Sequence, residues 1–460
     1  MNLRFMFFIY ILITLVSSFS YCQTYIMTVR NSENLLDSFC KTTKCEYLKL
    51  DKSAKEFANG NTFVKFKQNI AQKDILIVIP PTIDYNQFLE LLINIRTAKS
   101  EFAASVSVKV MPTTQNKINV IDNDKKIFLD ENLVLEFLDE AGADKFNSSK
   151  IKSQKIPQYS QTNKSVIVDQ GTNSKLAKEM AENLGVPILT FDEAMLHLKY
   201  QSLNVILISS VKEPHNLSFL EALDQVRKIK KMGSRVTLVT PYLPYARSDK
   251  KDQKGVSVIG RLAADLIERS GVNSVQFVRA HAPQSQGFFK IPSIQTMGRT
   301  TINTYLRSQG VEQIISPDAG FQKDATLYAD DLSVPVSVIN KQRDLETGES
   351  KLHDMSGPNV AGKTVAIIDD ETASGGTLAK AAEFLKQQGA KRVIAVVTHL
   401  AGNASQAIDS PFLDEIAVTN TFEIDNVNDK LKVLSIASEI STDLKLMLNI
   451  SSSCAKAYKD

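Results

Sequence analysis

Cysteine, histidine and net charge are all scarce in this chain of 460 residues, and the scarcity excludes several classes of function. The four cysteines form no Cys-x-x-Cys pair and no cysteine–histidine cluster with the spacing of a zinc site. Cys40 and Cys45 are close enough to form a disulfide in an oxidising compartment; otherwise they are two small apolar side chains. The formal net charge of +3 is small and spread along the chain, so we expect no nucleic-acid partner.

The first twenty residues have the order of a secretory signal peptide. Arg4 precedes an apolar run at residues 5–16, and small serines follow that run. The run is shorter than the roughly 20 residues that span a bilayer as a helix. We therefore expect residues 1–20 to export the protein to the periplasm or the medium, or to anchor it in a membrane without cleavage. If this signal does not function, the protein is cytoplasmic.

The chain partly repeats itself after about 130 residues. A strand-like run at residues 74–79 is followed by a helical pattern and then by a second strand that ends in a proline. The same order recurs from residue 204 onward. The tripeptide Phe-Leu-Glu opens the helical pattern in both copies, at residues 88–90 and 219–221. This shared tripeptide and the terminal proline favour a duplication over two unrelated strand–helix–strand units.

The length and the changes in composition predict several domains, because 460 residues exceed what one hydrophobic core usually holds. Residues 24–120 are expected to form an extra α/β domain. Residues 121–164 are rich in Asp, Lys, Ser, Asn and Gln and read as a linker, with one short helix near residues 134–138. Beyond them, strands alternate with helical segments, which predicts parallel sheets with helices on both faces, in domains at 165–310 and 311–450.

Residues 364–377 carry the clearest chemical pattern. An apolar strand runs into Asp369 and Asp370, a turn of small residues follows, and a helical pattern then begins. Ligands of open α/β sheets bind at the carboxyl ends of the strands. The turn leaves backbone N–H groups to wrap a phosphate at a helix start, and the two aspartates can accept hydrogen bonds from sugar hydroxyls. The pattern predicts a ribose-phosphate site made by Asp369, Asp370, Ala373, Ser374, Gly375, Gly376 and Thr377.

Two further strand ends carry groups that suit a nucleotide. Residues 241–251 combine aromatic side chains with Arg247, Ser248 and Asp249, which suits phosphates, a base and a metal or hydroxyls, although such a segment can also be a solvated loop. His281 follows another strand and is a candidate for binding a metal–nucleotide complex, although a single histidine is more often structural. Asp318, after the strand at 313–316, can ligate Mg²⁺.

Lys341 and Arg343 end the strand at residues 334–339 and open a long polar loop that extends to residue 362. Two cations on a mobile loop suit phosphoryl or pyrophosphoryl transfer, in which catalysis depends largely on positioning and charge neutralisation. The alternative is an exposed loop with ordinary surface charges.

Together these segments resemble the ribose-phosphate pyrophosphokinases, or phosphoribosyl pyrophosphate synthetases, over roughly residues 165–449. The loop at 369–377 alone would fit any type I phosphoribosyltransferase. Residues 241–251 resemble the family's PYxPYARQDKK nucleotide segment, residues 281–289 the second part of its DLHAxQIQGFF signature, and residues 340–343 its DKRR loop. The resemblance implies an α/β fold of tandem type I phosphoribosyltransferase-like domains, with parallel sheets flanked by helices.

The resemblance also implies an activity: a ribose-phosphate diphosphokinase that uses Mg²⁺ and transfers diphosphate from ATP to ribose 5-phosphate, making phosphoribosyl pyrophosphate for nucleotide biosynthesis. The family usually forms homo-oligomers. In the extra domain, residues 57–65 resemble a segment that lines the ATP base pocket across a subunit interface. Carried over by position, the roles are ATP binding for Arg247, Ser248, Asp249, Phe57 and Asn59; metal binding for His281 and Asp318; catalysis for Lys341 and Arg343; and ribose 5-phosphate binding for Asp369, Asp370 and Ala373 to Thr377.

Several residues depart from the family's pattern. Arg279 replaces the aspartate that opens the metal-binding signature, and Ala373 replaces an acidic residue in the sugar-phosphate loop. Glu371 adds a charge where an apolar residue is common, Phe321 replaces a glycine, and Ser248 replaces a glutamine. Loss of one carboxylate near transferred phosphates commonly costs a few kcal/mol. A weakened or inactive homologue that binds ribose phosphates or nucleotides as a regulatory subunit is therefore the alternative; a transferase acting on a base has only the shared loop in its favour.

Overall fold

The structure is a computed structural model, in which the signal segment, Cys40, Cys45, Phe57 and Asn59 lie outside the described residues. No helix of the described part is both long and apolar enough to cross a membrane. The described residues are 24–29, 32, 74–80, 82–100, 103, 105–110, 118–121, 129, 131–141, 165–197, 203–212, 215–251, 256–343, 350–424 and 428–448.

The described residues of the extra domain form a parallel sheet of three strands in the order β1-β2-β4, a short pair of strands, β3 and β5, and two helices. The carboxylate of Asp84 accepts a hydrogen bond from the backbone N–H of Gln87 (2.8 Å), which satisfies a free donor at the start of the first helix. The second helix extends beyond the short one expected near residues 134–138, and its apolar side chains are buried, so this part of the segment predicted as a linker belongs to the packed core. The elements are β1 (Thr24–Met27), β2 (Asp74–Ile79), β3 (Thr82–Asp84), α3 (Tyr85–Ser100), β4 (Ser105–Val110), β5 (Asn119–Ile121) and α4 (Glu131–Ala141).

The middle domain is built on a sheet of six parallel strands in the order β11-β10-β9-β8-β6-β7. Its strands are nearly continuous apolar runs because helices cover both faces. Helices α7 and α8 pack on one face, and α5 and α13 pack on the other. The elements are β6 (Ser165–Asp169), α5 (Ser174–Leu184), β7 (Ile188–Thr190), α6 (Phe191–His197), β8 (Asn204–Ile208), α7 (His215–Lys231), β9 (Arg235–Val239), α8 (Ile259–Arg269), β10 (Ser274–Val278), η1 (Pro283–Phe288) and β11 (Ser293–Thr296).

The C-terminal domain is built on a sheet of seven strands in the order β14-β13-β12-β15-β16-β17-β18. All neighbours are parallel except β13 and β14, which form an antiparallel pair at one edge. The elements are α9 (Arg299–Ser308), β12 (Gln313–Ser316), η2 (Ala319–Phe321), α10 (Gln322–Leu332), β13 (Val336–Arg343), β14 (Ser350–Ser356), β15 (Thr364–Thr372), α11 (Gly376–Gln387), β16 (Arg392–Leu400), α12 (Ser405–Asp409), β17 (Glu415–Thr419), β18 (Leu431–Leu434) and α13 (Ala437–Leu448).

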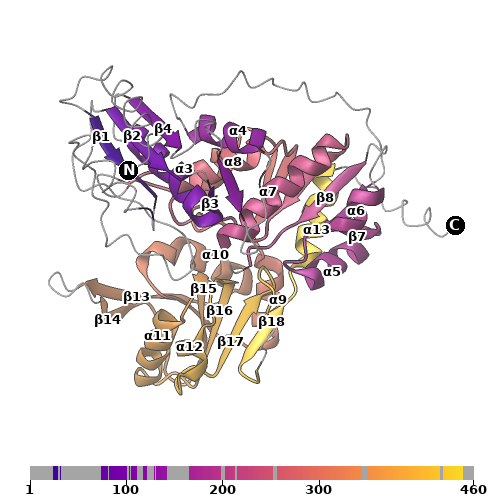
Figure 1. Cartoon of the computed structure of the whole chain (residues 1–460). Coiled ribbons are helices and arrows are strands. Elements are labelled where there is room, and N and C mark those ends of the chain that lie inside the picture. The colour runs from indigo at the N-terminus through magenta and orange to yellow at the C-terminus, as the bar shows by residue number, and fades with distance from the viewer. Residues whose placement is uncertain are drawn as a thin grey trace, which may run out of the picture.

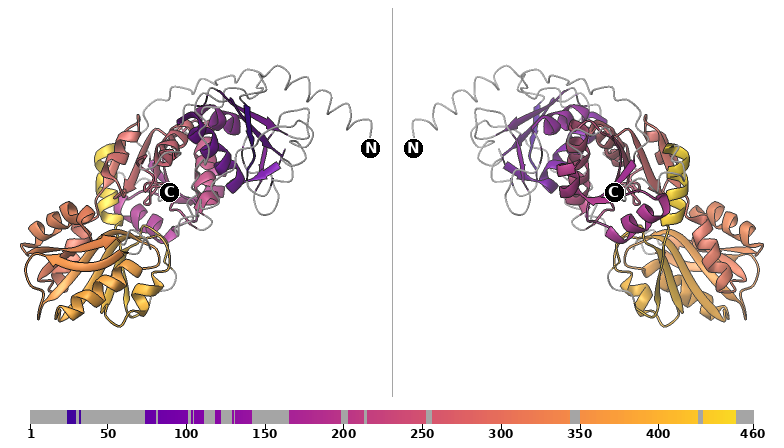
Figure 2. Two further views of the ribbon diagram at one scale, coloured as in Figure 1. Left: turned by 90° about the vertical axis from the view of Figure 1, so that its left-hand side faces the viewer. Right: turned by 90° about the vertical axis from the view of Figure 1, so that its right-hand side faces the viewer.

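The three sheets follow one another along the molecule, with the middle domain between the extra domain and the C-terminal domain (Figures 1 and 2). The last helix, α13, returns to the middle sheet, where the side-chain amide of Gln276 donates to the carbonyl of Ile440 (3.1 Å) and the hydroxyl of Thr296 donates to Asp443 (2.5 Å). This crossover fixes the C-terminal domain against the middle one. The predicted fold of phosphoribosyltransferase-like domains with parallel sheets flanked by helices is confirmed.

Candidate functional site

The end of β15 presents two adjacent aspartates at the carboxyl edge of the C-terminal sheet. Asp369 is half-buried and accepts a hydrogen bond from the backbone N–H of Asp370 (2.9 Å), and Asp370 is buried. Burial, and then the neighbouring charge of Asp370, raise the pKa of Asp369 well above its ordinary value. The raised pKa means that the charged form of Asp369 is unfavourable beside Asp370 and that hydroxyl donors or a cation would stabilise it, which suits a site for a sugar diol.

The predicted phosphate loop leads directly into helix α11. Gly375 is the N-cap with φ of +80°, in the left-handed region that favours glycine, and Ser374 and Thr377 are exposed. The N–H groups of the first turn have no partner within the helix and coincide with the positive end of its dipole. The loop therefore has the N–H donors and the positive dipole end that the predicted phosphate site requires, while Ala373 contributes only its backbone and a methyl group.

A neighbouring backbone segment after β16 holds this loop in place. The N–H of Ala401 donates to the carbonyl of Thr372, and the N–H of Ala404 donates to that of Ala373, both at 2.8 Å. A Cβ on Gly402 would lie 2.7 Å from the carbonyl oxygen of Ala373, so a side chain there would displace the loop. Sequence reasoning missed this support, because glycine in a loop gives no sign of what packs against it.

The predicted nucleotide segment meets the sugar-phosphate strand across the domain boundary. The hydroxyl of Tyr242 donates to the carboxylate of Glu371 (3.2 Å), and the half-exposed guanidinium of Arg247 lies 3.8 Å from the same carboxylate. Burial raises the pKa of Glu371, against the opposing effect of Arg247. Glu371, a departure from the family's pattern, therefore contributes to the contact between the two domains.

Ser248 and Asp249 are close to Arg247, but their side chains are already engaged. The hydroxyl of Ser248 accepts from the backbone N–H of Ile259 at the start of α8 (3.2 Å). Asp249 accepts from the side-chain amide of Gln284 (2.9 Å), which joins the 241–251 segment to the segment that follows His281. Arg247 is the most exposed of the three predicted ATP-binding residues described here.

His281 joins the middle domain to the paired aspartates. Its Nδ1–H donates to Oδ2 of Asp370 at 2.6 Å. This hydrogen bond raises the pKa of His281, against the effect of burial. Burial alone would raise the pKa of Asp370, but the hydrogen bond and charge of His281 outweigh it and hold that pKa below its ordinary value. A residue predicted for the metal site is therefore in contact with one predicted for the sugar.

Asp318 lies at the end of β12, beside β15. Its Oδ1 accepts from the backbone N–H of Phe321 (3.2 Å) and so caps the short helix η2. Its charge contributes to the raised pKa of Asp369, which indicates that the two carboxylates share a neighbourhood. Among the described residues no cluster of three or more His, Cys, Asp or Glu can hold a metal by protein ligands alone. The donor set fits Mg²⁺, which is usually bound through one or two carboxylates together with substrate oxygens and water.

Lys341 and Arg343 lie on strand β13, and the expected long polar loop includes a second strand. β14 pairs antiparallel with β13, so that Lys341 is opposite Leu352 and Arg343 is opposite Ser350. The register shifts between Asn340 and Lys341. The two predicted catalytic cations are thus on a hairpin at the edge of the C-terminal sheet.

Arg279 packs its guanidinium against helix α10 and the short helix η2 of the C-terminal domain. Its guanidinium pairs with Asp324 of α10 (3.0 Å) and lies over the rings of Phe321 (4.9 Å) and Tyr328 (5.9 Å). Its φ is +22°, and its backbone carbonyl accepts a hydrogen bond from Nε2 of His399 (2.9 Å). The charge of Arg279, which replaces the family's aspartate, is therefore neutralised by Asp324 of the C-terminal domain. No local sequence pattern predicts this contact.

Comparison with protein families agrees with this architecture. Residues 314–431 match the family described as the phosphoribosyl transferase domain. Residues 24–142 and 165–271 match the family described as the N-terminal domain of ribose phosphate pyrophosphokinase. The second description thus applies both to the extra domain and to the first part of the middle domain.

Individual proteins give the same result. The ribose-phosphate pyrophosphokinase of Wolinella succinogenes is 33% identical over 273 residues, covering 56% of this chain and 88% of the relative. That of Bacillus caldolyticus is 33% identical over 300 residues, covering 61% of this chain and 94% of the relative. The crystal structure of phosphoribosylpyrophosphate synthetase from Mycobacterium smegmatis has a TM-score of 0.56 and 26% identity, and covers 63% of this chain and all of that one. The chain belongs to the ribose-phosphate pyrophosphokinase family.

Proposed function

We propose that this protein is a ribose-phosphate diphosphokinase that makes phosphoribosyl pyrophosphate from ATP and ribose 5-phosphate. In this reaction the C1 hydroxyl oxygen of the sugar forms a bond to the β-phosphorus of ATP. The bond between that phosphorus and the oxygen bridging to the α-phosphorus breaks, AMP leaves with the bridging oxygen, and the hydroxyl proton is released. The curated relatives carry the name of this activity, and their motifs recur here at the corresponding strand ends.

The observation that carries the proposal is the contact between the two predicted half-sites. His281 follows a strand of the middle sheet, Asp370 lies near the carboxyl end of a strand of the C-terminal sheet, and their side chains are 2.6 Å apart. A second pair crosses the same domain boundary, because Arg247 of the middle domain lies 3.8 Å from Glu371 of the C-terminal domain. A nucleotide held by the 241–251 segment and a sugar held by Asp369 and Asp370 would therefore lie next to one another, as direct transfer between them requires.

The chain's own residues supply binding, orientation and charge. The N–H groups that begin α11 would hold the 5-phosphate, and the carboxylates of Asp369 and Asp370 would orient the ribose by accepting from its hydroxyls. Arg247 is exposed enough to pair with the phosphates of ATP. Lys341 and Arg343 lie on an edge hairpin and would neutralise the transferring phosphates when that hairpin is positioned over the site.

Asp318 and His281 would hold Mg²⁺ together with oxygens of the substrates. The metal would neutralise the phosphate oxygens and lower the cost of bringing them beside the paired aspartates. This assignment is compatible with the His281–Asp370 hydrogen bond, because Nδ1–H can donate to the carboxylate while the other ring nitrogen, Nε2, binds the metal.

The test is AMP release from ATP and ribose 5-phosphate in the presence of Mg²⁺, combined with calorimetric binding of ribose 5-phosphate. We expect AMP and phosphoribosyl pyrophosphate in equal amounts, loss of turnover in Lys341→Ala, and unchanged sugar-phosphate binding in that variant. Binding without AMP release by the unmodified chain would identify a non-catalytic ribose-phosphate-binding homologue. If ribose 5-phosphate does not bind at all, both the proposed enzyme and the non-catalytic ribose-phosphate-binding homologue are excluded.

We also propose that the extra domain supplies Phe57 and Asn59 to the ATP base pocket of the main body. The support is the resemblance of residues 57–65 to the family's base-pocket segment and the packing of the extra domain on the middle domain. In the full chain, Phe57→Ala should weaken ATP binding and leave ribose 5-phosphate binding unchanged. Equal ATP affinity in the variant and the parent would refute this role.

A further inference from the structure

Two charged pairs cross the contact between the extra domain and the middle domain. Arg96 of α3 donates to the buried carboxylate of Asp265 on α8 at 2.9 Å. Arg227 of α7 pairs with Glu136 on α4, and both of these side chains are largely buried. In each case the arginine is on the helix that contains the shared Phe-Leu-Glu tripeptide, α3 or α7, and the acid is on the next helix of the other domain, α8 or α4.

The partners in these pairs are equivalent positions of the internal repeat. Arg96 and Arg227 each stand eight residues after the phenylalanine of the shared Phe-Leu-Glu tripeptide. Glu136 stands three residues after Leu133 and directly before Phe137. Asp265 stands in the same way three residues after Leu262 and directly before Leu266. When residue i contacts residue j, and the equivalent of j contacts the equivalent of i, the interface is isologous, as in a two-fold symmetric dimer.

A third contact shows where the pseudo-two-fold axis passes. Asn86 is the second residue of α3 and Asn216 is the second residue of α7. The side-chain amide of Asn216 donates to the side-chain oxygen of Asn86 at 2.6 Å. Asn86 stands two residues before Phe88 and Asn216 stands three residues before Phe219, so the two are one position away from equivalence in the repeat. Nearly equivalent residues meet one another only close to the axis of a two-fold arrangement. The two domains are thus related by the symmetry of a dimer, although they belong to one chain.

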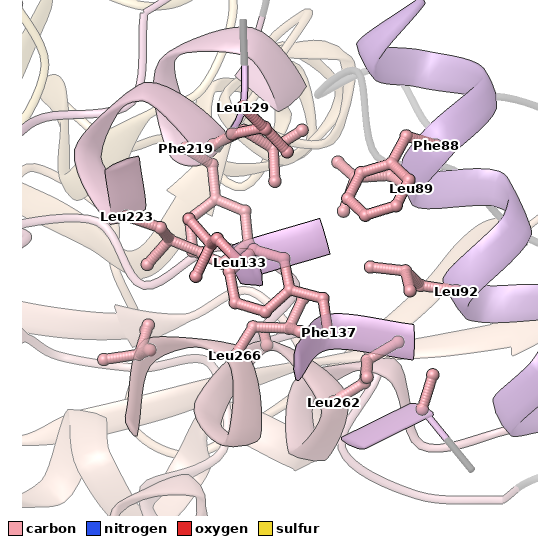
Figure 3. Close-up of a cluster of buried hydrophobic side chains, with 14 of the residues drawn as sticks. Phe88, Leu89, Leu92, Leu129, Leu133, Phe137, Phe219, Leu223, Leu262 and Leu266 are labelled. Atoms are coloured by element: carbon pink, nitrogen blue, oxygen red, sulfur yellow. The ribbon is translucent and has the colours of Figure 1, made fainter. Parts of the chain in front are cut away.

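The apolar core of the contact has the same symmetry. Figure 3 shows side chains from both domains gathered into one cluster, with α3 and α4 on one side and α7 and α8 on the other. All of its labelled members are buried. The equivalent pairs are Phe88 with Phe219, Leu92 with Leu223, Leu133 with Leu262, and Phe137 with Leu266.

From these three observations we infer that the extra domain takes the place of a second subunit, and that it closes the α7–α8 face of the middle domain to any other copy of the chain. The face carries large apolar side chains, which would drive self-association if they were uncovered. With α3 and α4 seated on it, a homo-oligomer of this protein must use other surfaces. The inference concerns assembly and does not depend on the proposed activity.

Cysteine cross-linking in the full chain tests this assignment. The background is the chain with Cys22, Cys40, Cys45 and Cys454 changed to serine, verified by an unchanged melting temperature. Asn86→Cys and Asn216→Cys are introduced singly and together, and each protein is treated with a short bis-maleimide. The double variant should give an internally cross-linked single chain, seen as a faster band on a denaturing gel, and neither single variant should give a two-chain band.

Three results would overturn the inference. A two-chain band from Asn216→Cys alone would mean that two copies meet through α7 with the extra domain displaced. A two-chain band from the double variant, without internal cross-linking, would mean that the extra domain docks on another copy. Absence of any cross-link, although both thiols react with a mono-maleimide, would mean that the two helices do not meet.

Discussion

The guanidinium of Arg279 lies 4.9 Å from the centre of the Phe321 ring, and each of these residues departs from the pattern of the family. Arg279 follows the middle sheet and Phe321 ends the short helix after β12, so the contact spans two domains. Asp324 neutralises the cation at 3.0 Å, and Tyr328 covers it from the same helix. The two departures are therefore coupled, and together they strengthen a domain contact beside the site.

This coupling predicts that restoring the family's acid is harmful. Arg279→Asp should lower the free energy of unfolding by about 3 kcal/mol, because it removes a largely buried ion pair and places two carboxylates near each other. Urea unfolding of the variant, with Asp324→Asn as the matched single change, measures the effect. If Arg279→Asp is as stable as the parent and releases AMP faster, then Arg279 weakens the metal site and does not stabilise the contact between the domains.

The sequence was sufficient for the fold class and for the local part of the site, because both depend on short-range patterns. An apolar strand, two aspartates and a small-residue turn must place their polar groups at a strand end, and the structure places Asp369, Asp370 and Gly375 there. The strands expected at residues 313–316, at 334–339 and directly before Asp369 are all present, and the last two extend farther along the chain than expected.

Contacts between distant segments could not be predicted in the same way. The partners of Arg279 are on a helix whose sequence shows only an ordinary amphipathic pattern, and Gly402 supports Ala373 through backbone proximity alone. The sequence predicts a loop where the hairpin that carries Lys341 forms, because the second strand of this hairpin is polar and pairs only on one side at the sheet edge.

Gly402 provides a test of the phosphate loop that leaves every predicted ligand in place. Gly402→Ala should weaken ribose 5-phosphate binding about tenfold or more, equivalent to roughly 1.4 kcal/mol, because the new Cβ would displace the backbone of Ala373. Gly362→Ala is the control: nothing lies within 4 Å of the Cβ position of Gly362, although its φ is positive (+75°). Calorimetry should show weaker binding in Gly402→Ala only; equal losses in both variants would indicate general strain.

The reciprocal ion pairs predict a measurable coupling across the pseudo-dimer contact. Arg227→Glu should lower the free energy of unfolding, and adding Glu136→Arg should recover part of the loss, with a coupling energy of about 1–2 kcal/mol. The exposed pair Lys212–Glu423, at 3.3 Å, is the matched comparison and should give less than about 0.5 kcal/mol. For each pair, thermal unfolding of the parent, the two single variants and the double variant gives the coupling energy. Equal coupling energies for the two pairs would argue against a packed contact between α4 and α7.

His399 predicts how stability depends on pH. Burial lowers its pKa to about 4, while in the unfolded chain an ordinary histidine titrates near 6.5. As the pH falls from 6.5 toward 4, the unfolded state takes up a proton that the folded state does not, so the free energy of unfolding falls by at most about 3 kcal/mol on this account. His399→Gln can keep a donor for the carbonyl of Arg279 and an acceptor for Thr421, but it does not titrate. Urea unfolding at pH 7, 6 and 5 should therefore show a shallower loss in the variant, and parallel losses in the two proteins would mean that His399 is already protonated in the fold.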